Sequence, residues 1–201
     1  VDLCGHATLA TAFALWETGR VDCDDDISFT TRSGMLEVRR EQDMIKMNFP
    51  AEPATSCKPP NGLAEALGAE ILWCGQNRMD HLVEVANEQT LLDLRPDFAS
   101  LARLDTRGVI VTAAAERDNV DFVSRFFCPV LGIDEDPVTG SAHCCLAPFW
   151  ARRLDRDELT GFQASQRGGV VCCEVVCDRV ELSGRAVKIF SGTMSAPPAG
   201  A

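Results

Sequence analysis

The chain has little positive charge. Its 201 residues include 19 lysines and arginines against 30 aspartates and glutamates, which gives a net charge of -11 at pH 7 and a pI near 4.7. Nucleic acids and anionic membrane surfaces would repel such a chain. We therefore expect neither nucleic acid nor a membrane among its partners.

Long apolar segments and targeting signals are also missing. No hydrophobic run is long enough to span a bilayer, and the opening VDLCGHATLA lacks the basic region of a secretory signal peptide. Because 46% of the residues are hydrophobic and 24% are charged, the chain can bury an ordinary core. These features favour a cytoplasmic protein of one large or two small domains.

Motifs for cofactors are absent as well. The three histidines are scattered at positions 6, 81 and 143, and no two cysteines have the spacing of zinc-finger ligands. The glycines match neither a dinucleotide-binding nor a phosphate-binding loop. We expect no metal ion and no organic cofactor.

Cysteine, in contrast, is abundant, with ten residues. They could form the disulfides of a secreted protein, but a chain of this size can fold without such bridges. Two cysteine pairs are adjacent in sequence, which suits disulfides poorly, and VVCCEVVC is an apolar run in which cysteine acts as a small buried hydrophobe. The pattern favours a reducing compartment and mostly structural thiols.

Two segments predict helices built from small residues. Residues 5–18 form a helical pattern that ends at Gly19, and its alanines 7, 10 and 14 share one face. Residues 140–154 form the second, with Pro148 expected to bend it. Helices this thin can lie inside a closely wrapped sheet.

The rest of the chain predicts strands and short helices. Strands are expected at 27–31, 35–40, 44–49, 71–74, 82–86, 108–113, 121–127, 169–177, 179–182 and 186–191, and short helices at 62–67, 88–94 and 97–102. The proline-rich residues 51–60 are the best linker candidate. We predict an α+β fold with a partial N-terminal lobe at 1–50, a linker at 51–60 and a C-terminal lobe at 61–201. In one alternative the last strand returns to the first lobe.

Each thin helix is preceded by a glycine-containing turn. Leu3–Ala7 (LCGHA) precedes the first, and residues 134–143 (DEDPVTGSAH) contain the start of the second. A helix start carries free N–H groups and a partial positive charge, so it can hold a carboxylate. Two facing starts would make a pocket for a small acid, with His6, Asp136 and Ser141 pointing into it.

Five stretches resemble the phenazine biosynthesis-like (PhzF) family, which has the diaminopimelate-epimerase-like fold. They occur in the family's order across nearly the whole chain: LCGHATLATA, FTTRSGMLEV, MNFPAEP, GIDEDPVTGSAHCCLAPFW and SQRGG. The resemblance implies two similar lobes, each a curved, mostly antiparallel sheet wrapped around one central helix. It implies a site between the lobes, and the first lobe here would be incomplete.

The resemblance also implies an activity. Relatives are cofactor-independent isomerases, and in the phenazine enzyme a glutamate moves a proton between carbons of a cyclohexadiene amino acid. His6 and Asp136 match catalytic positions, while Gly5, Gly140 and Ser141 match substrate-binding positions. We expect a small carboxylated substrate and consider a homodimer. The glutamate belongs to a motif upstream of Val1, so the sequence is expected to be N-terminally truncated, inactive and poorly stable.

The same positions have structural explanations. Asp136 precedes a proline, where aspartate commonly starts a turn, and the hydroxyls of Thr139 and Ser141 can cap a helix. His143 is expected beyond the pocket, and His81 is expected to be structural or exposed. Residues 166–169 (QRGG) form either a plain β-turn or an anion-binding turn at the rim.

Related racemases use two facing cysteines, one at each helix start. Cys4 occupies the first such place, but the second holds Thr139, whose hydroxyl is far less acidic than a thiol. Racemisation by two thiols is therefore not expected. The alternatives to an isomerase are a non-catalytic relative that binds a small molecule or a protein, and a truncated product without a stable fold.

Overall fold

The computed structural model describes residues 5–31 and 34–192. The helices are α1 (Gly5–Glu17), α2 (Leu63–Leu67), α3 (Glu88–Asp93), α4 (Phe98–Leu101) and α5 (Gly140–Leu154), with a 3-10 turn at Pro129–Leu131. The strands are β1 (Ile27–Thr31), β2 (Gly34–Glu41), β3 (Met44–Pro50), β4 (Thr55–Ser56), β5 (Trp73–Gln76), β6 (Asp80–Glu84), β7 (Gly108–Ala114), β8 (Phe122–Cys128), β9 (Ile133–Glu135), β10 (Glu158–Gln163), β11 (Gly169–Val176) and β12 (Arg179–Gly184).

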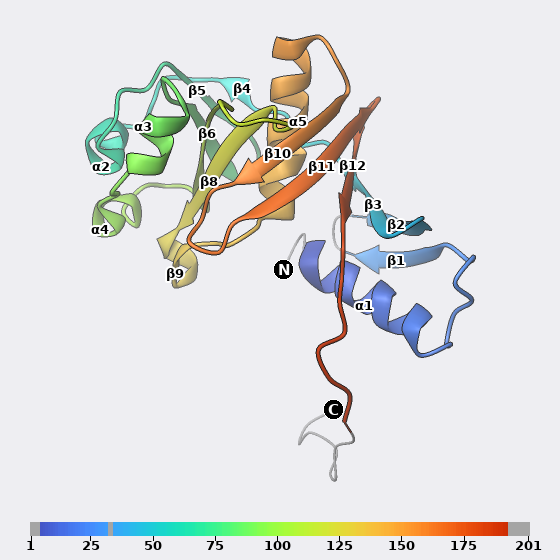
Figure 1. Cartoon of the computed structure of the whole chain (residues 1–201). Coiled ribbons are helices and arrows are strands. Elements are labelled where there is room, and N and C mark those ends of the chain that lie inside the picture. Colours follow the sequence, from blue (N-terminus) through green and yellow to red (C-terminus); the bar gives the residue numbers. More distant parts are fainter. Residues whose placement is uncertain (1–4, 32–33, 193–201) are drawn as a thin grey trace.

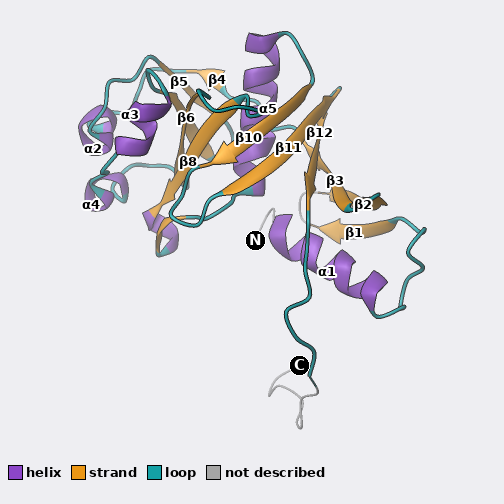
Figure 2. Ribbon diagram, in the orientation of Figure 1, coloured by secondary structure: helices purple, strands orange, loops and turns teal. Residues whose placement is uncertain are grey.

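All twelve strands belong to one sheet, in the order β1-β2-β3-β12-β11-β10-β8-β7-β6-β5-β4, with β9 added to β8 (Figures 1 and 2). The pairs β6–β7 and β8–β10 are parallel, and the other pairs are antiparallel. The sheet passes from β3 to β12 without a break, so residues 44–50 join a strand near the other end of the chain. The fold is therefore α+β, as expected.

The sheet curves around α5. Strands from β2 to β8 direct apolar side chains such as Val38, Phe49 and Leu182 into the core cluster that contains this helix. Small residues of α5 lie in this cluster, all at most 1% exposed: Ala142, Cys144, Cys145 and Ala147. Small side chains let the sheet approach closely, and the expectation of a thin, enclosed helix is confirmed for α5.

A second core cluster lies on the other face of β5–β8. Here α2, α3 and α4 bury Leu63, Leu91 and Leu101 against Val109 and Val111. The neighbouring residues Leu82 and Ile110 point to the α5 side. Because helices cover both faces, β7 (GVIVTAA) is apolar along most of its length, and β6 is buried at every residue except Glu84.

α1 is less enclosed than α5. Its alanines 7, 10 and 14 are exposed, and the helix packs on β3 and touches the start of α5. Trp16 is buried, and its indole N–H donates to the Asp25 carbonyl at 3.1 Å. Leu9 and Phe13 are half-buried. The described strands cover only one side of α1.

Residues 51–60 dock on α5 and contain the short strand β4. Pro148 lacks an N–H, which would otherwise donate to the carbonyl of Cys144 one turn earlier. That carbonyl accepts the N–H of Glu52 at 3.0 Å instead. The proline in α5 therefore frees an acceptor that fixes this segment.

Three differences from the expected elements follow from tertiary contacts. Residues 186–191 form no strand, and their side chains Val187, Ile189 and Phe190 are 76–84% exposed. Strand β10 and the short strands β4 and β9 lie where no strand was expected, and β5 and β6 are displaced by two residues from the expected 71–74 and 82–86. Among residues 5–31 and 34–192, none of the helices has the length and hydropathy that a membrane crossing requires.

Candidate functional site

The starts of α1 and α5 touch each other. A Cβ atom placed on Gly140 would lie 3.5 Å from the Cα of Gly5, and one placed on Gly5 would lie 3.6 Å from the Cα of Gly140. Two glycines at the contact let the backbones approach this closely. The free N–H groups and positive dipole ends of two long helices therefore meet at one place.

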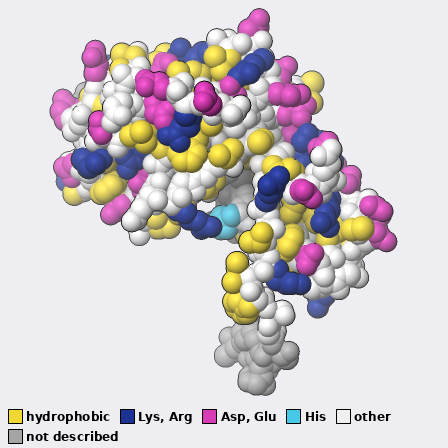
Figure 3. Space-filling view, viewed as in Figure 1, with side chains coloured by type: hydrophobic (Ala, Val, Ile, Leu, Met, Phe, Trp, Pro, Cys, Tyr) yellow, Lys and Arg dark blue, Asp and Glu magenta, His cyan; other side chains and the backbone are white. Residues whose placement is uncertain are grey.

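His6 follows directly on this contact and is exposed, whereas His81 and His143 are buried. Figure 3 shows a hollow between the larger and the smaller part of the molecule, with histidine colour in it and basic side chains at its edge. The hollow lies close to where α1 begins in Figure 1.

Asp136 belongs to a closed turn before α5. Its carboxylate accepts a hydrogen bond from the Thr139 hydroxyl, and its N–H donates to the Phe126 carbonyl at 3.0 Å. The fully buried amide of Gln163 donates to the Asp136 carbonyl at 2.7 Å and accepts the Thr139 N–H at 2.8 Å. The Thr139 hydroxyl thus orients Asp136 rather than capping α5.

Ser141, in the first turn of α5, is held by Arg107, which forms an ion pair with Asp80. Its hydroxyl oxygen accepts a hydrogen bond from Arg107 Nη2 at 3.0 Å. The same guanidinium makes a two-point contact with the fully buried carboxylate of Asp80, at 2.8 Å for Nε to Oδ1. Burial raises the pKa of Asp80, and the guanidinium opposes this shift. Since the Ser141 oxygen already accepts, its hydrogen is left to donate.

His143 is fully buried one turn into α5. Its Nδ1 lies 2.8 Å from the Thr139 carbonyl, so this nitrogen donates and Nε2 carries the lone pair. Nε2 has no hydrogen-bond partner in the described structure. Burial lowers the pKa of this imidazole to about 4, so His143 is a neutral structural residue at pH 7.

The turn at 166–169 is fixed against the Asp136 turn. The Ser165 hydroxyl donates to the Pro137 carbonyl at 2.7 Å and accepts the Gly168 N–H at 3.0 Å. A Cβ atom on Gly169 would lie 2.5 Å from Val138 Cγ2, so a glycine is needed for this contact. Arg167 is exposed at the tip.

The predicted site residues thus divide into groups. Gly5 and Gly140 are in contact, and His6, Asp136 and Ser141 lie on the segments that this contact joins. Cys4 lies outside the described residues. His81 is buried in β6, where burial lowers its pKa; of the two expectations, structural or exposed, the first is confirmed.

Sequence reasoning missed Asp80, Arg107 and Gln163. Asp80 begins β6 and Arg107 directly precedes β7, and because these strands are parallel their starts lie together. Opposite charges just before two buried strands are a signal that could have indicated the pair. Gln163 ends a strand that was not expected, and its role depends on the approach of the Asp136 turn.

The structure also contains cavities away from this junction. One of about 580 Å³ borders the other end of α5, between Ala51, Arg152 and Asp178. Its lining includes none of the predicted site residues Gly5, His6, Asp136, Gly140 and Ser141. We place the candidate site at the helix junction, where the polar groups converge.

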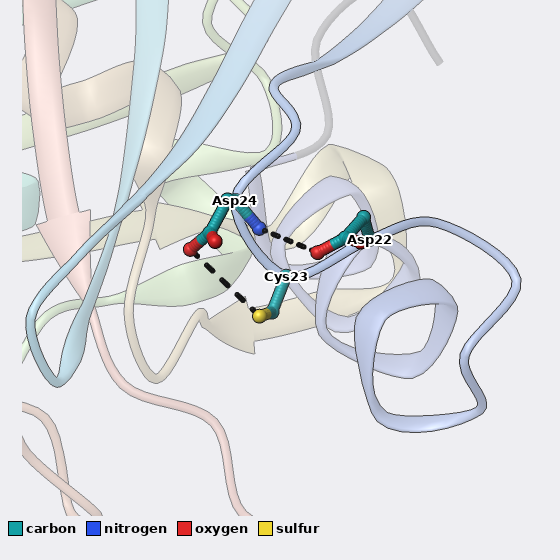
Figure 4. Close-up of side chains that lie close together, drawn as sticks. All are labelled: Asp22, Cys23 and Asp24. Carbon is teal, nitrogen blue, oxygen red and sulfur yellow. Dashed lines mark hydrogen bonds between the residues drawn. The ribbon is translucent and has the colours of Figure 1, made fainter.

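Within residues 5–31 and 34–192, one group of three side chains could bring metal-ligating atoms together. Asp22, Cys23 and Asp24 have these atoms within 4.8 Å of one another, and all three are exposed (Figure 4). The Cys23 sulfur is 3.8 Å from Asp24 Oδ1. The nearby Asp24 carboxylate raises the pKa of this thiol, which disfavours the thiolate that binds metals. An exposed acidic turn explains the group without an ion.

Comparison with known proteins gives a consistent result. The family model described as "Phenazine biosynthesis-like protein" matches residues 1–192. An uncharacterized isomerase of Pseudomonas aeruginosa is 50% identical over 197 residues, covering 96% of this chain and 73% of its own. One of Halalkalibacterium halodurans is 46% identical over 191 residues, covering 94% and 72%.

Solved structures agree with these matches. A PhzC/PhzF protein from Clostridium difficile is 38% identical with a TM-score of 0.86, covering 98% of this chain and 74% of that one. A predicted epimerase from Pseudomonas aeruginosa has a TM-score of 0.66 at 18% identity, covering 95% and 76%. The second likeness shows a shared epimerase-like fold.

Proposed function

Because the chain belongs to the phenazine biosynthesis-like protein family, we propose that it is a cofactor-independent isomerase which transfers a proton on a small carboxylated substrate. The observation that carries the proposal is the contact between Gly5 and Gly140. Two helix starts that meet offer their free N–H groups to one anion. The relatives named as isomerases support the reaction class.

The polar groups around the junction suggest roles. The Asp136 carboxylate, oriented by Thr139, and the exposed His6 would bind the reacting part of the substrate and exchange protons with it. The Ser141 hydroxyl, whose oxygen is occupied by Arg107, would donate its hydrogen to the substrate carboxylate. Arg107 is neutralised by Asp80, so it acts by positioning Ser141.

The turn at 166–169 would add a charge at the rim. Ser165 and Gly169 tie this turn to the Pro137–Val138 segment, so Arg167 is carried close to the Asp136 turn. A guanidinium there suits a second acidic group of the ligand. We further propose a cytoplasmic setting, which the two adjacent cysteine pairs, poorly suited to disulfides, support.

We also propose that these 201 residues bind the substrate without turning it over. The resemblance assigns the main proton-transferring group to a glutamate in a motif that this sequence does not contain. General acid–base catalysis contributes roughly 10²–10⁴-fold, so binding and turnover are separable here. The competing proposal, a non-catalytic binding relative, predicts binding alone under all conditions.

The test begins with binding. Malonate and 2-aminobenzoate would be titrated into ¹⁵N-labelled protein, and we expect shifts at the amides of Gly5, Gly140 and Ser141. Ser141→Ala should weaken binding about tenfold or more, because it removes a donor to the ligand carboxylate, while the exposed control Ser191→Ala should leave it unchanged. If neither acid moves these amides, or if both variants respond alike, the site assignment is wrong.

Turnover is tested separately. The uncharacterized isomerase of Pseudomonas aeruginosa that is 50% identical to this chain would supply the segment that the chain does not match. This segment would be fused ahead of Val1. Proton exchange on ligands in D₂O would be followed by ¹H NMR for the chain and for the fusion. The isomerase proposal expects exchange by the fusion and its loss when the supplied glutamate is changed to glutamine. Binding with no exchange by the fusion supports the non-catalytic alternative.

A further inference from the structure

Cys57 and Cys74 face each other at the β4 edge of the sheet. Their sulfur atoms are 3.8 Å apart, and the Cys57 N–H donates to the Cys74 carbonyl at 3.0 Å. We propose that this pair is a reversible redox site, which closes to a disulfide by exchange with a small-molecule disulfide such as oxidised glutathione. The pair lies outside the helix junction and is independent of the function proposed above.

The backbone is already arranged for the bond. Ser56 pairs with Gly75 and Thr55 with Gln76, so the next position along places Cys57 opposite Cys74. Opposite residues in antiparallel strands have Cα atoms about 4.5–5.5 Å apart. Disulfides need roughly 4.4–6.8 Å. Rotation of the side chains, without movement of the strands, can therefore bring the sulfurs into bonding distance.

The two thiols differ in access. Cys57 is half-buried, whereas Cys74 is 4% exposed. Burial, with a smaller contribution from Cys57, raises the pKa of the Cys74 thiol to about 12, so Cys74 stays protonated until a partner sulfur is in contact. An oxidant in solution therefore reaches Cys57 first. Cys144, Cys145 and Cys173 are enclosed in the core and offer no such entry.

The chemistry is two successive exchanges. The Cys57 thiolate attacks one sulfur of oxidised glutathione, the S–S bond breaks, and one glutathione leaves as a thiolate. The Cys74 sulfur, losing its proton to that thiolate, then attacks the Cys57 sulfur of the mixed disulfide and releases the second glutathione. The two protein thiols lose two electrons, and one glutathione disulfide becomes two thiols.

The bond would fasten the segment 51–60 to the β5–β6 hairpin. Glu52 of this segment already accepts from the Asn77 side chain through its carbonyl at 3.2 Å. The closed loop joins residues 17 positions apart and contains α2. Closing a loop of this size restricts the unfolded chain, so the oxidised protein should be the more stable form.

The experiment uses the whole chain with Cys23→Ser and Cys177→Ser, because these two exposed thiols could cross-link separate molecules. Reduced protein would be incubated with oxidised glutathione, alkylated, and digested with chymotrypsin, which cleaves between Trp73 and Cys74. We expect fragments carrying Cys57 and Cys74 joined by a bond that reduced glutathione reverses. A glutathione that stays on Cys57 while Cys74 alkylates would overturn the proposal, as would two alkylated thiols.

Thermal unfolding provides a second readout. Oxidation should raise the melting temperature by about 5–10 °C, and Cys57→Ser should abolish that rise. Cys172→Ser is the matched control, since Cys172 is also a half-buried strand cysteine, and it should keep the rise. An equal rise in Cys57→Ser, or no rise in the parent, would contradict the assignment.

Discussion

His143 shows how one residue makes folding depend on pH. Its Nδ1–H is satisfied by the Thr139 carbonyl, while Nε2 is buried without a partner in the described structure. A proton added to Nε2 would be a buried charge with nothing to accept its hydrogen bond. The first turn of α5, which carries Ser141, therefore depends on a neutral imidazole.

We predict that this residue costs stability in mild acid. The folded pKa of about 4 lies below the ordinary value of 6.5, so the unfolded chain binds a proton between these values and the folded chain does not. Stability is then lost as the pH falls from about 6.5 to 4, by about 3 kcal/mol in total. Urea unfolding at several pH values measures this loss.

His143→Gln keeps a donor for the Thr139 carbonyl but does not titrate. Between pH 6.5 and 4, the free energy of unfolding of this variant should fall by about 3 kcal/mol less than that of the parent, whatever the variant's stability at pH 7. Ser56→Ala, an exposed change that involves no titrating group, is the control and should keep the parent's slope. Identical slopes in the parent and His143→Gln would refute the prediction.

At the scale of elements, a row of charged side chains crosses the strands β2, β3, β12 and β11. These strands join α1 and β1–β3 to the rest of the sheet. Arg39 on β2 makes a two-point contact with Glu181 on β12, at 2.7 Å for each pair of atoms. Lys46 on β3 lies 3.1 Å from Glu181 and 2.8 Å from Glu174 on β11. These pairs connect strands β2, β3, β12 and β11 in the order of the sheet.

We predict that Glu181→Gln destabilises the fold by about 1–2 kcal/mol. This is less than for a fully buried pair, because the Arg39 side chain is 39% exposed and solvent screens it. Chemical denaturation measures the change. Glu37→Gln, an exposed β2 residue, is the control and should stay within about 0.5 kcal/mol of the parent.

The same pair has its own pH window. The hydrogen bonds from Arg39, aided by Lys46, lower the pKa of Glu181 below its ordinary 4.5. Its contribution is present above that value and is lost as the pH falls through the lowered pKa. Glu181→Gln should therefore flatten the most acidic part of the stability curve and leave the His143 window unchanged. A change confined to pH 5–6 would contradict this.

At the scale of the whole molecule, one side of α1 and the segment after β12 expose apolar surface. Val187, Ile189 and Phe190 are 76–84% exposed. Together with Ala10, Phe13 and Ala14 they border a cavity of about 410 Å³. Apolar surface of this kind commonly marks a place of association.

We predict that the chain self-associates through this surface. The double variant Ile189→Ser/Phe190→Ser should have a lower molar mass by light scattering and should bind less of a hydrophobic dye. Leu72→Ser removes a 56% exposed leucine elsewhere and should change neither. Association that persists in the double variant and disappears in Leu72→Ser would place the contact elsewhere.

Much of this protein was determined by local sequence. The helices at 5–17 and 140–154, most strands and the turn before α5 follow from side-chain periodicity and turn chemistry, which act over a few residues. The motifs around His6 and Asp136 also identified the family, because their residue types and order can be seen without a fold. Even the enclosed α5 was indicated by its small residues.

Tertiary structure decided what depends on partners distant in sequence. Three kinds of contact join residues that no local pattern connects. They are the Gly5–Gly140 contact, the pairing of β3 with β12, and the hydrogen bonds from Arg107 and Gln163 to the start of α5. Residues 186–191 carry a strand-like pattern yet pair with nothing in the described sheet, while Glu158–Gln163 pairs on both sides. A strand needs a neighbour for its backbone hydrogen bonds, and only the assembled sheet decides which segment has one.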